Sequence, residues 1–245
     1  MEIRKEIIEY IEDTIKPQYA DFDTVHDVDH FYFVVNNCIA YTKELIDNGI
    51  DIDVDMSYTI GAYHDLGLTK GEDMHTKYSA DMLREDKKLR DFFSETDIET
   101  MAVAIEDHAS LLDREPRNIY GKLIADAERS NSIKHVFERP IMLSLANDPE
   151  DMSKTKRVNK IIKFVEEKFG KDGYVNFWLG IPAVAKEQKN LWELLEDRQK
   201  CRNFVNKLYD ELKSKLNWYW NYKKYVIKYS YKLRSIFYLE GNYGK

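Results

Sequence analysis

The chain has 245 residues, 43% of them hydrophobic and 33% charged, a composition that excludes a disordered, collagen-like or linker-like protein. No apolar run approaches the roughly 18–20 residues that a membrane span needs, so we expect no membrane partner. The formal net charge of -7 argues against general nucleic-acid binding, and two isolated cysteines, Cys38 and Cys201, indicate a cytoplasmic location.

Apolar residues recur at helical spacing along most of the chain, and no segment alternates convincingly in the way of a β-strand. Such stripes run through the segments 31–46, 98–105 and 158–169. Asn118 is typical of an N-cap before a further helix, and the segment 191–212 indicates one long or broken helix. The pattern predicts an all-α protein with short loops.

The segment 217–245 differs from the rest in composition, because it holds six Lys/Arg against one Glu, interleaved with aromatic residues. We therefore expect a first helical domain over 1–140, a helical extension over 141–216 that packs on the same core, and a basic aromatic tail over 217–245. Aromatic rings with cations can stack on single-stranded nucleic acid or lie at a membrane surface. The plainer alternatives are a final helix packed on the bundle and an extension foreign to the fold.

Histidines are concentrated in the first part of the chain, each close to an acidic residue: His26, His30, His64, His75 and His108. A single histidine is more often a buried hydrogen-bonding residue than a ligand, so the interpretation depends on the whole set. Imidazole nitrogens with carboxylate oxygens suit divalent Mn, Fe, Co, Ni, Zn or Mg. A structural zinc site is not expected, since no thiolate accompanies them.

A His-Asp doublet and two later histidine segments form a recognisable series. The doublet lies within the run Ala62–Gly67, and the later segments are His75–Ala80 and Ile105–His108. Together with His30, this series resembles the HD-domain superfamily of metal-dependent phosphohydrolases over residues 20–135. The resemblance implies an all-α HD-domain helical bundle with the metal in its core, and we expect additional C-terminal helices.

The resemblance also implies a set of metal ligands, formed in the family by a histidine, the His-Asp doublet and a distant aspartate. Carried over to this sequence, the first three ligands are His30, His64 and Asp65. His26 is expected beside the ligands. His75 and His108 match positions that reach the substrate phosphate or, in members with two ions, a second metal.

The fourth ligand is where the sequence departs from the family. Relatives read Ala-Asp-Arg at this position, whereas this chain reads Ala127-Glu128-Arg129, with Asp126 two residues before Glu128. On a helix these two carboxylates point roughly 200° apart, so both do not easily hold one ion. Either Glu128, the first choice, ligates with its longer arm, or Asp126 does after a local shift. A weakened site without metal and two solvated helix charges remain as alternatives.

Basic side chains near the motif are candidates for contacting a phosphate. Arg129 is the foremost of them, because it directly follows the presumed ligand. The others are Lys70, Lys77, Arg114 and Lys122.

The sequence thus predicts a metal-dependent phosphohydrolase in which a divalent ion activates water for attack on phosphorus. The expected catalytic residues are His64, Asp65, His75, His108 and Arg129. The resemblance implies a small phosphoester as substrate, first of all a nucleotide, and we expect no nucleic-acid partner except through the 217–245 tail. The alternative is an HD-fold ligand-binding or regulatory module with weakened catalysis. The metal hypothesis fails if the rings of His30 and His64 lie more than about 7 Å apart.

Overall fold

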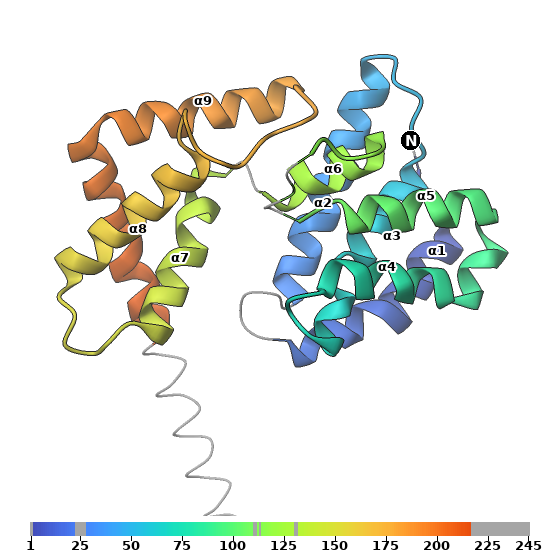
Figure 1. Cartoon of the computed structure of the whole chain (residues 1–245), viewed down its shortest axis with the longest axis horizontal. Helices are drawn as coiled ribbons and strands as arrows, with labels where there is room; N and C mark the ends of the chain where they lie inside the picture. Colours follow the sequence, from blue (N-terminus) through green and yellow to red (C-terminus); the bar gives the residue numbers. More distant parts are fainter. Residues whose placement is uncertain (1, 23–27, 110–111, 113, 130–131, 217–245) are drawn as a thin grey trace, which may run out of the picture. The chain divides into compact units, whose positions relative to one another are not determined.

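The computed structural model describes residues 2–22, 28–109, 112, 114–129 and 132–216, and this part of the chain is all-α, as predicted (Figure 1). The helices are α1 (Lys5–Tyr10), α2 (Val28–Asp47), α3 (Val54–Tyr63), α4 (His75–Glu85), α5 (Glu95–Glu106), α6 (Ile119–Glu128), α7 (Ile133–Asn147), α8 (Lys154–Phe169) and α9 (Pro182–Glu196). Shorter helical turns are Ile11–Ile15, Lys16–Asp21, Leu66–Lys70 and Lys87–Asp91. Residues 198–216 are helical as well, so the helical pattern over 191–212 is broken after α9.

Contacts group the chain into two compact units. Of the described residues, the first unit contains those from 2 to 136 together with 166–193, and the second contains 137–165 and 194–216. The expected tail over 217–245 lies outside the described residues, as does His26. None of the described helices is both long and apolar enough to cross a membrane.

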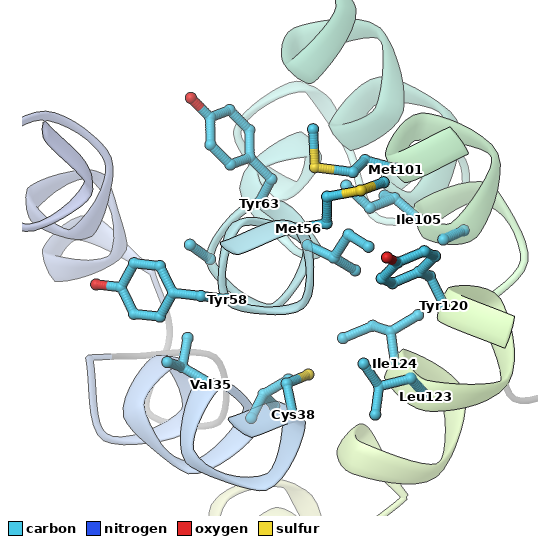
Figure 2. Close-up of a cluster of buried hydrophobic side chains, with 14 of the residues drawn as sticks. Val35, Cys38, Met56, Tyr58, Tyr63, Met101, Ile105, Tyr120, Leu123 and Ile124 are labelled. Atoms are coloured by element: carbon cyan, nitrogen blue, oxygen red, sulfur yellow. The ribbon is translucent and has the colours of Figure 1, made fainter. Parts of the chain in front are cut away.

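Helix α3 lies at the centre of the first unit. Every residue from 55 to 63 is buried, since α2, α4, α5 and α6 all contact this helix. Figure 2 shows Val35 and Cys38 reaching it from α2, and Tyr120 and Ile124 reaching it from α6. Because α3 is covered on every side, the residues that directly follow it also lie in the interior of the unit.

The residues before α2 belong to the same core. Ile7, Ile11, Ile15 and Tyr19 recur at every fourth position and are at most 3% exposed. This spacing places them on one face of α1 and of the two turns that follow it. Residues 2–22 are therefore an integral part of the first unit.

Helix α4 begins in close contact with the turn that follows α3. The backbone N–H of Gly67 donates to Ser79 Oγ at 2.8 Å. A Cβ atom at residue 67 would lie 2.1 Å from the carbonyl oxygen of His75 and 2.5 Å from the backbone nitrogen of Ser79. Only glycine allows this approach, which fixes the start of α4 against the end of α3.

Asp107, directly after α5, ties residues 114–117 to the end of that helix. Its buried carboxylate accepts hydrogen bonds from Arg114 Nη2 at 2.6 Å and from Arg117 Nη2 at 2.8 Å, both on Oδ1. Burial raises the pKa of Asp107, but the bonds from both arginines outweigh this effect and lower the pKa to about 2.

The second unit has a core of its own. Its buried apolar residues come from α7, from α8 and from the helical segment 198–216, and include Ile141, Val158, Ile161, Val205 and Leu208. The rings of Phe137 and Phe204 pack edge to face at 5.7 Å. At the surface of this unit, Lys154 and Asp210 form an ion pair at 2.7 Å.

Replacing Gly67 by alanine should lower the free energy of unfolding by about 3 kcal/mol, because the new methyl group meets backbone atoms that cannot move aside. Gly49→Ala is the control. Gly49 has a left-handed φ of 81° but open space around it, so alanine there should cost only about 1 kcal/mol of backbone strain. Urea denaturation measures both; equal costs would contradict the close-packing argument.

Asp107→Asn should reduce stability in a pH-dependent way. The pKa of Asp107 falls from an ordinary 3.8 to about 2 on folding, so its charge contributes roughly 2 kcal/mol above pH 4. That contribution is lost as the pH falls from about 4 through about 2. The difference in unfolding free energy between wild type and variant should therefore shrink on acidification below about pH 4. A difference that stays constant over this range would contradict it.

Candidate metal centre

Histidine rings converge on the carboxylate of Asp65, which is 2% exposed. His64 Nε2 and His30 Nε2 lie 3.1 and 3.3 Å from Asp65 Oδ2. His75 Nε2 and His108 Nε2 lie 3.7 and 3.8 Å from the other oxygen, Oδ1. The ring centres of His30 and His64 are 5.3 Å apart, inside the limit of about 7 Å that the metal hypothesis sets. The fold thus brings together residues scattered over positions 30–108.

A local hydrogen bond of one kind orients the rings of His64, His75 and His108. In each, Nδ1 lies 2.6–2.8 Å from the backbone carbonyl oxygen three residues earlier in the chain. Because a carbonyl only accepts, Nδ1 carries the hydrogen, and Nε2 of the neutral ring keeps its lone pair. In the neutral rings, the Nε2 atoms that face Asp65 are therefore available to bind a metal ion.

The cluster is assembled from the ends of helices. His30 lies in the first turn of α2, and His75 is the first residue of α4. His64 directly follows α3, and His108 lies two residues beyond α5. Carbonyls in the last turn of a helix have no partner within it, and the rings of His64 and His108 each satisfy one of these.

Burial and the charges of the cluster shift its pKa values. Burial raises the pKa of Asp65, but the neighbouring His64 and His30 outweigh it and hold this pKa well below its usual range. Burial lowers the pKa of His64, yet Asp65 outweighs burial and the net pKa is raised. Burial dominates for His30 and His108, whose pKa values are lowered. An ionised carboxylate among imidazoles is a donor set that attracts cations.

The donor atoms fit a divalent ion. Asp65 Oδ2 and His108 Nε2 are buried without a hydrogen-bond partner among the described residues, an arrangement that costs free energy unless a ligand completes it. For ligand bonds of about 2.0–2.2 Å, two donors on one ion lie roughly 3–3.5 Å apart. The donors of His30, His64 and Asp65 lie 3.1–3.3 Å apart.

A second donor group shares the same carboxylate. The ligand atoms of Asp65, His75 and His108 all lie within 4.8 Å of one another. Imidazole nitrogen and carboxylate oxygen favour Mn, Fe, Co, Ni or Zn in both groups.

Glu128 and Asp126 are placed differently, although both lie on α6. Glu128, its last residue, has Oε2 at 3.9 Å from His108 Nε2. The carboxylate of Asp126 accepts the backbone N–H groups of Trp178 at 3.0 Å and Leu179 at 2.9 Å. Burial raises the pKa of Asp126 to about 6, although both N–H groups act against it. The structure therefore brings Glu128 to the edge of the cluster and directs Asp126 to the segment around residue 178.

Arg129 links two segments of the first unit by hydrogen bonds. It is 5% exposed, and it donates from Nη1 to the carbonyl of Asn176 at 2.5 Å and from Nη2 to that of Ala109 at 3.3 Å. These bonds join the end of α6 to the residue after His108 and to the segment 176–179. The expected contact of Arg129 with a phosphate stays a prediction.

The other basic candidates are either paired with a carboxylate or exposed. Arg114 pairs with Asp107, and Lys122 pairs with Glu115. Lys70 and Lys77 are exposed.

Two contacts near the cluster have no signal in the sequence. The N–H groups of 178 and 179 reach Asp126 across more than fifty residues, and the hydroxyl of Tyr19 reaches the backbone of Asp65 across 46 positions. The four-residue repeat that ends at Tyr19 indicates burial, but burial alone does not distinguish a core ring from one with a hydroxyl at the site.

Comparison with known proteins identifies part of the chain. The family model described as HD domain matches residues 26–133, which include His30, the doublet, both later histidines and Glu128. No curated protein and no solved structure matches the chain. Residues 26–133 of the chain thus form an HD domain, and proteins with this domain are generally metal-dependent phosphohydrolases.

Proposed function

We propose that this chain is a metal-dependent phosphohydrolase with two divalent ions at the Asp65 cluster. The observation that carries the proposal is the position of the Asp65 carboxylate between two donor groups. Oδ2 faces the pair His30 and His64, whereas Oδ1 faces the pair His75 and His108. With an imidazole pair at each oxygen, these residues would supply donors for two divalent cations.

The residues around this carboxylate would bind the ions in two groups. His30 and His64 would hold one ion with Asp65 Oδ2, and His75 and His108 would hold the other with Oδ1. Glu128 is the candidate for a further ligand, since it stands next to His108. Ions bound there would lower the pKa of a coordinated water toward neutrality and offset the negative charge of a phosphate.

The substrate reaches the cluster from the side of His75. The side chain of His75 is 26% exposed, whereas those of His30, His64, Asp65 and His108 are at most 5% exposed. The expected substrate is a small phosphoester in the cytoplasm, with nucleotides as the first class to test.

Metal content tests the proposal directly. The full chain, loaded with Co²⁺ and freed of excess ion by dialysis, should retain two ions per chain in elemental analysis. His30→Ala and His75→Ala should each lose one ion, because each histidine belongs to one donor group. His135→Ala is the matched control. Its ring stacks on Phe33 at 4.1 Å, and His135 is in neither donor group, so this variant should retain both ions.

A measurement of phosphoester hydrolysis is the second part of this test. A screen of nucleotides and other phosphoesters with Mn, Mg, Co and Ni should show turnover that Asp65→Asn lowers roughly 100-fold or more. Equal turnover by the two proteins would reveal a contaminating phosphatase. A chain that binds no metal would overturn the proposal in favour of a regulatory or ligand-binding module.

Substitutions on α6 separate the two candidates for the additional ligand. Glu128→Gln should weaken Co²⁺ binding at least ~10-fold, measured by calorimetric titration. Asp126→Asn should leave Co²⁺ binding within about twofold of wild type, yet lower the free energy of unfolding by ~1–3 kcal/mol, because two partly buried N–H groups lose an ionised acceptor. The opposite pattern would assign the ligand to Asp126.

A further inference from the structure

Tyr19 lies directly behind the His-Asp doublet and outside the matched HD domain. It belongs to the turn Lys16–Asp21, and none of its surface is exposed. Its hydroxyl donates to the carbonyl oxygen of Ala62 at 2.9 Å and accepts the backbone N–H of Asp65 at 3.4 Å. One phenol can do both, since it has one hydrogen to donate and lone pairs that accept.

These two backbone groups lie on either side of His64, where the chain leaves α3. The helix ends at Tyr63, and the carbonyl of Ala62 is one of those in the last turn that the helix itself leaves unpaired. Asp65 is no longer helical, with φ -108° and ψ 2°, and its carbonyl accepts from Leu68 as the next turn begins. The hydroxyl thus binds the backbone on both sides of the bend after α3, and this bend sets the directions of the His64 and Asp65 side chains.

The ring of Tyr19 is held in place by its neighbours. It packs on Phe22 at 5.0 Å and edge to face on Phe31 at 5.1 Å. Phe31 directly follows His30 on α2, and the ring of His64 lies 6.4 Å from that of Tyr19. The residue therefore contacts the two elements that carry His30 and the doublet.

We propose that Tyr19 is a positioning residue of the metal centre. Its hydroxyl fixes the backbone on both sides of His64, so that the two oxygens of Asp65 face the two pairs of imidazoles. This inference rests on the proposed metal-dependent function.

The chain offers a matched control at the opposite end of the same helix. The hydroxyl of Tyr120 accepts the backbone N–H of Asp53, the N-cap of α3, at 2.8 Å. Tyr120 is 8% exposed and also belongs to the core. Tyr19→Phe and Tyr120→Phe therefore each remove one buried hydroxyl that pairs with the backbone at an end of α3, but only Tyr19 lies at the doublet.

The experiment compares Co²⁺ binding by the full-length wild type, Y19F and Y120F. Each apo protein is first shown to be folded by circular dichroism, and then titrated while the visible absorption of bound Co²⁺ is recorded. We expect Y19F to bind Co²⁺ about 10-fold more weakly, with an altered absorption spectrum, as is usual when a residue that orients a ligand is changed. Y120F should keep the wild-type affinity within about twofold and the wild-type spectrum.

The outcomes are distinguishable. Wild-type affinity and spectrum in Y19F, or an equal loss in both variants, would overturn the positioning role and leave the proposed metal centre intact. No Co²⁺ binding by the wild type would overturn the proposed function itself. If Y19F does not fold, Phe22→Leu takes its place, because it keeps the hydroxyl and removes a ring that packs on Tyr19. That variant must then bind Co²⁺ more weakly than Y120F, and equal affinities would overturn the proposal.

Discussion

A single buried carboxylate, that of Asp65, sets the constraint on which the first unit depends. An ionised carboxylate is costly to remove from water unless charges or hydrogen bonds compensate it. Here four imidazole Nε2 atoms lie at 3.1–3.8 Å, contributed by α2, α4 and the residues that follow α3 and α5, and a proton or a metal ion on these nitrogens supplies the compensation. The arrangement of these helices and the protonation of the cluster are consequently coupled.

The use of helix ends explains how so many ligand atoms reach one point. A side chain at a helix end can approach a centre that side chains in the middle of neighbouring helices cannot share, because helix axes stay about 8–10 Å apart. The ends also supply unpaired carbonyls, which orient the rings of His64 and His108. Each end must then be fixed precisely in space. Gly67 does so for α4, and Asp107 with its two arginines holds the end of α5 next to His108.

The helices could be predicted from sequence because apolar spacing is a local property, and the family resemblance pointed to the histidines that meet at Asp65. The choice between Glu128 and Asp126 could not be made in this way. Helical geometry separates their directions but does not say which direction faces the cluster. That depends on the segment 176–179, whose N–H groups occupy Asp126 and which no local pattern connects with α6. The two hydrogen bonds of Arg129 could not be predicted for the same reason. Their acceptors are backbone carbonyls, which every residue has and which no side chain in the sequence marks.

The unit that supports the site is larger than the family's matched segment. Residues 26–133 contain the cluster, yet the hydroxyl that binds the backbone on both sides of His64 comes from Tyr19, before that segment. The groups that satisfy the buried charge of Asp126 come from 178 and 179, after it. Without these flanks the Ala62 carbonyl would lose a hydrogen bond, and a buried carboxylate would stand two residues from Glu128 without its donors. Unpaired buried groups of this kind destabilise their surroundings. The flanking segments are therefore part of the physical domain in which the site forms.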